Sequence, residues 1–218
     1  MNLMLIAIAV IVVVGLIPIL LRRRLINTYL RLLQKNDING VEMLVASKLA
    51  KTILPQFNRE YMLLNSYIRA NDNNKAEAKV NKIISEVPMN DKQKATLASQ
   101  IFYKYIENQD EKMTDKIVKM MSETKEYAIH RQMDMINDTL VKGGNKYLDE
   151  LKTDVDDEEY RNVNKDISYQ EFLLAVIYKN MNNSIQANKY KNMALRDSKG
   201  TSYESLIHSQ LSYLNENV

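Results

Sequence analysis

Few side chains in this sequence combine the types and the spacing that chemistry requires. His130 and Asp134 lie four residues apart in a predicted helix, and Asp138 extends the same row, so the three can share one helix face. Histidine and aspartate are both metal ligands, but two or three such residues on a solvated face more often bind nothing. We therefore predict no metal ion and no catalytic residue here. A hydrolase with an unrecognised site around His130 and Asp134 is the least favoured alternative.

The acidic run from Asp154 to Glu159 is the second candidate for ligand binding. A calcium loop of the EF-hand type needs a glycine at its sixth position and a glutamate at its twelfth. With Asp154 as the first position, Glu159 and Lys165 occupy those two places, so the ligand geometry fails. The segment 154–167 is therefore predicted to be an acidic polar linker.

The composition of the chain excludes several classes of protein. Its 218 residues include no cysteine and only five glycines, which removes thiol catalysis, disulfides and zinc sites built on thiolates. Neither a dinucleotide-binding glycine motif nor a P-loop occurs. There are 30 Lys and Arg residues against 27 Asp and Glu, and three of the basic ones form a single triplet, so the remainder is balanced. We expect no cofactor and no general attraction to nucleic acid.

The first element that the sequence predicts is an uncharged apolar run over residues 2–21. About 20 residues of helix, at 1.5 Å each, cover the roughly 30 Å of a bilayer's hydrocarbon core. A buried core helix normally keeps a polar stripe, whereas this run is apolar on all sides. A signal peptide would need basic residues before the run and a small-residue cleavage site after it. We predict a single transmembrane helix at residues 1–21.

The direction of this anchor follows from Arg22, Arg23 and Arg24, which come directly after the apolar run. Arginines that flank a membrane span remain on the cytoplasmic side. We therefore expect the N-terminus outside and the remainder of the chain in the cytoplasm, with a basic helix over 22–35 continuing from the membrane.

Beyond the anchor, the sequence predicts an all-α protein built from helical hairpins. Only three prolines occur, and the apolar spacing indicates consecutive helices separated by short polar breaks, one of them over residues 37–54. Short turns between helices make antiparallel pairs. We expect helical hairpin repeats over 36–153, and a C-terminal hairpin with a capping helix over 168–218.

Two of these hairpins resemble tetratricopeptide repeats. The positions that match the repeat in the stretch ending at residue 88 are Leu63, Leu64, Tyr67, Ala76, Val80, Ile83 and Pro88. A second copy, displaced by 111 residues, has Leu174, Tyr178, Ala187 and Ala194 at the corresponding places. The small alanine lets the paired helices approach closely. The sequence departs from the repeat at Glu60 and Glu171, which stand where the usual tryptophan would be, and at Thr114, which replaces the alanine in a weaker middle copy.

This resemblance implies a surface that binds proteins. Asn65 sits at a position that faces the groove in tetratricopeptide domains, where it would bond a peptide backbone. Our leading hypothesis is a non-enzymatic scaffold or adaptor that is attached to the membrane through residues 2–21 and binds protein partners at the membrane face. The alternative is an accessory subunit of a larger membrane complex for secretion or envelope assembly.

Overall fold

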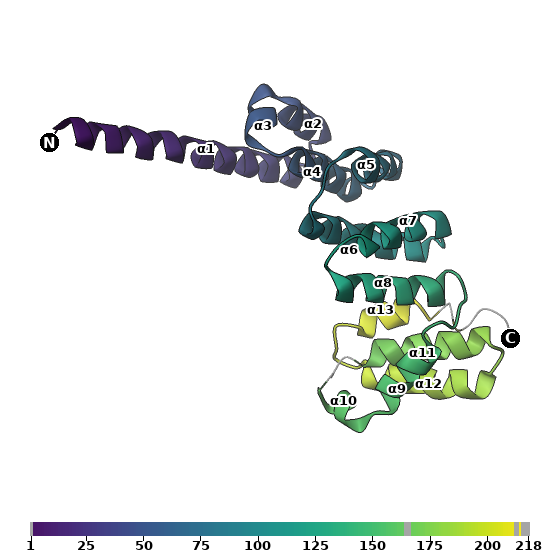
Figure 1. The fold of residues 1–218 in the computed structure, drawn as a ribbon. Coiled ribbons are helices and arrows are strands. Elements are labelled where there is room, and N and C mark those ends of the chain that lie inside the picture. The colour runs from purple at the N-terminus through teal and green to yellow at the C-terminus, as the bar shows by residue number, and fades with distance from the viewer. Residues whose placement is uncertain (1, 164–166, 212–213, 215–218) are drawn as a thin grey trace. The chain divides into compact units, whose positions relative to one another are not determined.

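The computed structural model describes the backbone of residues 2–163, 167–211 and 214, and the side chains of 16–161, 163, 167–211 and 214. Every regular element in these ranges is a helix, which confirms the predicted all-α fold. The chain divides into two compact units, Met1–Gln93 and Lys94–Val218. Figure 1 shows the helices of each unit in chain order.

The first unit is built around the C-terminal half of a long helix. Its elements are α1 (Asn2–Gln34), α2 (Ile38–Ala46), α3 (Lys48–Ile53), α4 (Gln56–Arg69) and α5 (Asn73–Glu86). The core that joins α1 to the other helices consists of Leu25, Tyr29, Val41, Val45, Ala50, Leu54 and Met62. The hydroxyl of Tyr29 donates a hydrogen bond of 3.2 Å to the carbonyl oxygen of Met62, which fixes α1 against α4.

The single helix that we expected over 37–54 is divided at Ser47. This residue has extended backbone angles, φ −60° and ψ 149°, and it ends α2 and begins α3. Its hydroxyl accepts a hydrogen bond of 3.1 Å from the backbone N–H of Ala50, as a serine N-cap does. Apolar periodicity continues across the break, so it does not reveal where a capping side chain divides a helix.

Helix α1 runs without interruption from Asn2 to Gln34 and contains Pro18. In the part of the chain that the structure describes, no helix combines the length and the apolar run needed to cross a bilayer. The span predicted at 2–21 depends largely on the side chains of residues 1–15, which lie outside the described residues. Leu16, Ile17, Ile19 and Leu20, at the end of the predicted span, are exposed.

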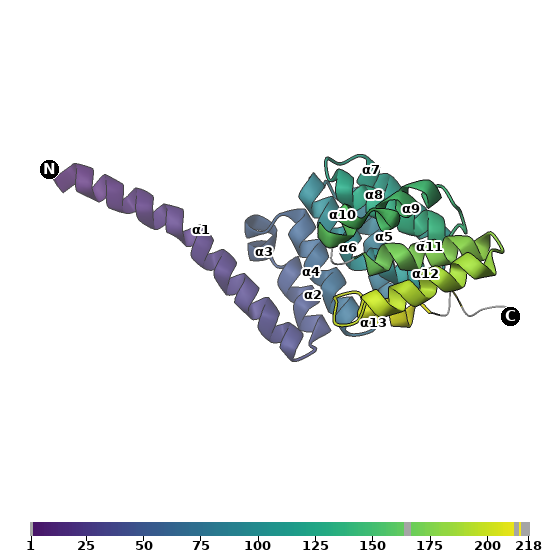
Figure 2. The same ribbon diagram turned by 90° about the horizontal axis from the view of Figure 1, so that it is seen from below.

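The second unit contains the remaining helices. They are α6 (Asp91–Glu107, whose first residues belong to the first unit), α7 (Glu111–Ser122), α8 (Tyr127–Leu140), α9 (Leu148–Asp156), α10 (Glu158–Val163), α11 (Ser168–Asn180), α12 (Ser184–Asp197) and α13 (Glu204–Ser209). Helix α11 packs along α12 and also contacts α8 and α9, so most of its first ten residues are buried. Figure 2 shows α11 and α12 side by side.

The segment 154–167, which we predicted to be a linker, holds the end of α9 and the whole of α10. Residues 164–166 of that segment lie outside the described residues.

One turn geometry recurs at four helix–helix connections. At each, a residue with φ between 53° and 57° is followed by an N-cap; the pairs are Asn36–Asp37, Asn71–Asp72, Gln109–Asp110 and Asn182–Asn183. The backbone N–H of each cap donates to the carbonyl oxygen five residues earlier, at 2.8–3.0 Å. Its side chain accepts a backbone N–H three residues later, at 2.8–3.2 Å. One turn therefore provides hydrogen-bond partners for a backbone carbonyl group at the end of one helix and for a backbone N–H group at the start of the next.

Replacing Asp72 with alanine removes one of these caps. Asp72→Ala is expected to lower the free energy of unfolding by about 1 kcal/mol, because the N–H of Lys75 loses its acceptor. Urea unfolding followed by circular dichroism measures the change. Glu77→Ala, an exposed position in the same helix, is the control and should leave the midpoint nearly unchanged. An equal shift in both variants would contradict the capping role.

Candidate functional site

The residues that match the repeat in the first hairpin line the contact between α4 and α5. Leu64, Ala76, Val80 and Ile83 are buried, with exposed fractions of 0 to 3%. Tyr67 is buried as well, and its hydroxyl donates a hydrogen bond of 2.8 Å to the carboxylate of Glu42 on α2.

The other two residues that match the repeat in this hairpin do not lie between α4 and α5. Leu63 is half-buried against the core around α1, and Pro88 is exposed at the end of the hairpin.

The second hairpin places the corresponding residues between α11 and α12. Leu174, Ala187 and Ala194 are buried. Tyr178 is half-buried, and its ring stacks on that of Tyr190 with the centroids 5.5 Å apart and the planes parallel. Small side chains on α12 thus leave room for a large aromatic pair beside them.

Thr114 lies four residues after its N-cap, as Ala76 and Ala187 do, and it is fully buried. Its hydroxyl donates to the carbonyl oxygens of Asp110 and Glu111, both at 3.1 Å, so the polar group is satisfied within its own helix. This local bond explains how a threonine occupies a position that is alanine in the other two hairpins.

Asn65, the predicted groove residue, lies half-buried on α4. Its side chain forms hydrogen bonds with the hydroxyl groups of Tyr29 and Tyr61. Burial raises the pKa of Tyr29 to about 12, and the bond to Asn65 opposes that rise. Asn65 therefore takes part in the contact between α1 and α4, and its role toward a partner stays a prediction.

Glu60 stands at one of the two tryptophan positions of the repeat and bridges the hairpin. It lies 2.6 Å from the Nζ of Lys79 and 3.5 Å from that of Lys82, and its side chain is 13% exposed. Burial opposes ionisation of the carboxyl group, but the two ammonium groups outweigh it, so its pKa is lowered. An ion pair thus joins α4 to α5 at this position.

Glu171 stands at the other tryptophan position and is 0% exposed on α11. The Nη1 of Arg161, on α10, lies 2.9 Å from its Oε1. The Nη2 of the same guanidinium donates to the Oδ2 of Asp197, on α12, at 2.8 Å. One arginine is thus shared by two carboxyl groups from two different helices, and it holds α10 against α11 and α12.

The electrostatics of this cluster favour one bound proton. Burial, and next the charge of Asp197, raise the pKa of Glu171 to about 7, although Arg161 opposes the rise. The pKa of Asp197 is lowered, first by its hydrogen bonds with Arg196. Sequence reasoning marked Glu171 only as a departure from the repeat. The available signal was an acidic residue directly before the apolar stretch from Phe172 to Ile177.

Stability should depend on pH through Glu171. Its pKa in the folded protein, about 7, lies above its ordinary value of 4.5. The folded state therefore holds a proton that the unfolded state releases, and this contribution to stability is lost as the pH rises from 4.5 through about 7. Glu171→Gln, which needs no proton, is expected to flatten the unfolding free energy over that range.

Urea unfolding at a series of pH values measures this effect. Glu107→Gln, an exposed glutamate of the same unit, should keep the pH profile of the unaltered protein. A Glu171→Gln profile indistinguishable from that of the unaltered chain would refute the role of this carboxyl group.

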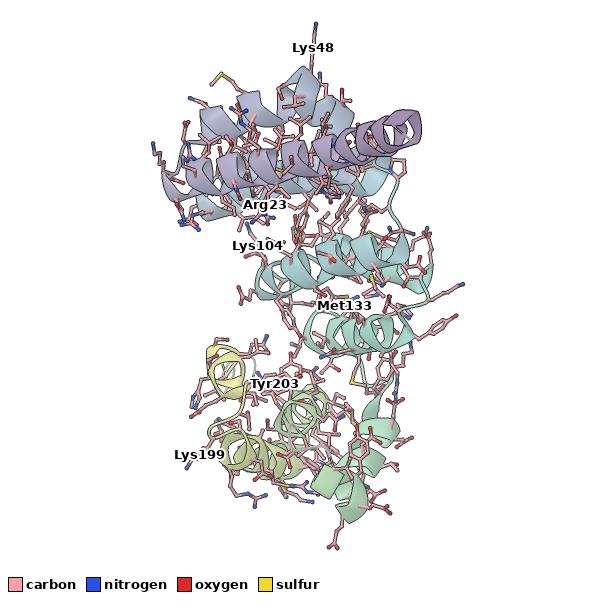
Figure 3. The ribbon with its side chains drawn as sticks, turned by 90° about the vertical axis from the view of Figure 1, so that its left-hand side faces the viewer. Arg23, Lys48, Lys104, Met133, Lys199 and Tyr203 are labelled. Atoms are coloured by element: carbon pink, nitrogen blue, oxygen red, sulfur yellow. The ribbon has the colours of Figure 1, made fainter. Side chains whose placement is uncertain are left out.

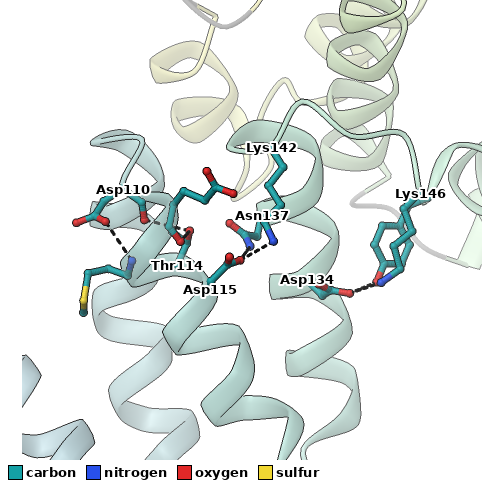
Figure 4. Close-up of polar contacts among 10 residues, drawn as sticks. Asp110, Thr114, Asp115, Asp134, Asn137, Lys142 and Lys146 are labelled. Carbon is teal, nitrogen blue, oxygen red and sulfur yellow. Dashed lines mark hydrogen bonds and ion pairs between the residues drawn. The ribbon is translucent and has the colours of Figure 1, made fainter.

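In the row of His130, Asp134 and Asp138 on α8, the two aspartates hold a loop in place. Figure 4 shows Asp134 beside Lys146. Asp134 accepts hydrogen bonds from the Nζ of Lys146, at 2.6 Å, and from the hydroxyl of Tyr147. Asp138 accepts one of 3.1 Å from the backbone N–H of Lys146. In the described part of the chain, no group of three or more potential ligands is placed to hold a metal ion.

The absence of a side chain at Gly144 lets the loop after α8 lie close to Asp138. A Cβ atom at Gly144 would lie 2.4 Å from the Oδ1 of Asp138, so a side chain there would force the Asp138 carboxylate to move. Nearby, Asp115 on α7 pairs with Lys142 at 2.6 Å and accepts a hydrogen bond of 2.8 Å from Asn137 (Figure 4). The polar groups of this region therefore join α7, α8 and the following loop.

Arg22, Arg23 and Arg24 are exposed on α1, and Arg23 is labelled in Figure 3. No ion pair joins these three guanidinium groups to a carboxylate among the described residues. Helix α1 itself contains no acidic residue.

Comparison with known proteins found no match: no protein-family model, no curated protein and no solved structure is similar to this chain.

Proposed function

We propose that this protein is a scaffold or adaptor, attached to a membrane through residues 2–21, which binds protein partners on tetratricopeptide-like helical hairpins and carries out no catalysis. The observation that carries the proposal is the turn that recurs at four connections, from Asn36–Asp37 to Asn182–Asn183. A recurring turn makes a recurring hairpin, and arrays of such hairpins bury their core between neighbours while leaving broad surfaces for partners.

The packing at these hairpins supports a common unit. The residue four positions after each cap is buried, and the four residues are Val41, Ala76, Thr114 and Ala187. Each of them is small or β-branched, which suits the narrow space beside the preceding helix. The ion pair of Glu60 and the cluster of Glu171 replace the usual aromatic contact, so the proposal is for a divergent form of the repeat.

Helix α1 is continuous from the apolar run into the core of the first unit, so the proposed span and the domain would lie close together. Leu25 and Tyr29 belong to the core of the first unit, and they lie on the same helix as the apolar run. From residue 21 to residue 25 the helix rises about 6 Å. A domain held so near a membrane meets partners on that membrane at a raised effective concentration, so modest contacts suffice for binding.

The proposed orientation can be tested by protease accessibility in sealed cells. The domain is expected to be protected, because Arg22, Arg23 and Arg24 keep this flank in the cytoplasm. Replacing all three with asparagine should expose a substantial fraction of the domain. The double variant Lys48→Asn and Lys51→Asn, which removes charge farther along the chain, should remain protected. Digestion of the unaltered domain from outside would overturn the cytoplasmic placement.

The proposed role predicts a protein partner that copurifies with the chain. Affinity purification from a detergent extract, analysed by mass spectrometry, should recover the same protein in independent experiments. Repeated recovery of nothing beyond the background of an unrelated anchored protein would count heavily against a scaffold.

A second candidate, an accessory subunit of a larger membrane complex, is favoured by one feature of α1. Its exposed apolar residues continue past the arginines, and they are Leu16, Ile17, Ile19, Leu20, Ile26 and Leu30. A subunit that packs through this face would lose its partners when residues 1–21 are replaced by an unrelated transmembrane helix. An adaptor should keep them, so the same copurification on the exchanged chain decides between the two.

A further inference from the structure

Helix α13, together with its N-cap Tyr203 and its C-cap Gln210, contacts the rest of the second unit at three positions. The ring of Tyr203 stacks on that of Tyr169, on α11, with the centroids 5.3 Å apart and the planes at 17°. Ile207 is 0% exposed. The side chain of Gln210 is buried and accepts a hydrogen bond of 3.2 Å from the Tyr169 hydroxyl. Tyr203 is labelled in Figure 3.

These contacts join helices that are far apart in the sequence. Tyr169 lies at the start of α11, while α12 also contacts α13. On α6, the pKa of Tyr103 is raised first by burial and then by the nearby Tyr203. Residues from α11 and α12 thus border the surface that α13 covers.

Helix α13 has the size and pattern of a ligand rather than of a core element. It spans six residues, and isolated helices shorter than about 12 residues are marginal in water, so its order depends on the surface beneath it. Its contacts follow the spacing i, i+4 and i+7, the pattern with which an amphipathic helix enters a groove. Ser205, His208 and Ser209, on its other side, are exposed.

The fit of Gln210 is incomplete. Its Oε1 accepts the hydrogen bond from Tyr169, but its Nε2 is buried and has no hydrogen-bond partner among the described residues. A buried donor that lacks an acceptor weakens binding. A different helix with an acceptor at this place, and no orphaned donor, would therefore compete effectively with α13.

We propose that the surface bordered by α11 and α12 is a docking site for a short amphipathic helix of a partner protein, and that α13 occupies it as an internal ligand. The partner helix presents an aromatic side chain, an aliphatic one four residues later, and a hydrogen-bond acceptor three residues after that. The inference rests on the proposed function, because it names the partner class and the regulation of a scaffold. Partner binding then requires the release of α13.

The first experiment frees the surface in the full chain and offers α13 back as a separate peptide. The probe is a fluorescent synthetic peptide of residues 199–211, and its binding is measured by anisotropy. Ile207→Asp in the protein should release α13, so the peptide should bind this variant at least tenfold more tightly than the unaltered chain. The same substitution in the peptide should abolish its binding.

Ser205→Asp is the matched control, because Ser205 lies on the exposed side of the same helix. This variant should bind the peptide no better than the unaltered protein does. Failure of the peptide to bind a folded Ile207→Asp chain would overturn the proposal, and so would equal binding by both variants.

Hydrogen exchange on the unaltered chain tests the same idea without a variant that has to fold. The amides of residues 207–211 should exchange at least tenfold faster than those of residues 172–177 in α11, because an internal ligand detaches while the unit stays folded. Equal protection of the two segments would show that α13 is part of the core and would overturn the inference. Peptide binding without a copurifying protein would defeat the proposed scaffold role alone, whereas a copurifying protein without peptide binding would defeat this inference alone.

Discussion

The structure depends on a turn in which one residue adopts a left-handed backbone and the next caps a helix. L-amino acids avoid this backbone region, and asparagine tolerates it best after glycine. Asn36, Asn71 and Asn182 therefore suit the position, while Gln109 adopts the same angles with its side chain bonded to the carbonyl oxygens of Ile106 and Leu140. Because the turn reverses the chain within two residues, it sets which side chains of the second helix lie beneath the first.

Two glutamates at corresponding positions, Glu60 and Glu171, show how tertiary contacts shift the ionisation of a carboxyl group. Glu60 keeps partial exposure and meets two lysines, so the ionised form is favoured. Glu171 has no exposure and shares one arginine with Asp197, and burial followed by the charge of Asp197 raises its pKa to about 7. Burial of a charge is costly unless its partners compensate for the lost water, and here the deeper burial of Glu171 and the neighbouring charge of Asp197 make the difference.

The two ends of the chain use helices in opposite ways. At the N-terminal end, α1 contributes Leu25 and Tyr29 to a core while its other face stays exposed. At the C-terminal end, α13 adds Ile207 and Gln210 to a surface that α11 and α12 have already built. Helix α1 is therefore an integral part of its unit. Helix α13 is short, and it stays ordered only through its contacts with the surface beneath it.

The sequence by itself determined the all-α class, because this depends on neighbours in the chain: helical apolar spacing with few glycines and prolines. It did not reveal the division at Ser47, since periodicity runs through that residue. It also missed the cluster of Arg161 and Glu171, because ten residues and a change of helix separate the two. Which polar groups meet, and whether a carboxyl group keeps its proton, depends on packing between distant segments, and only the tertiary structure decided it.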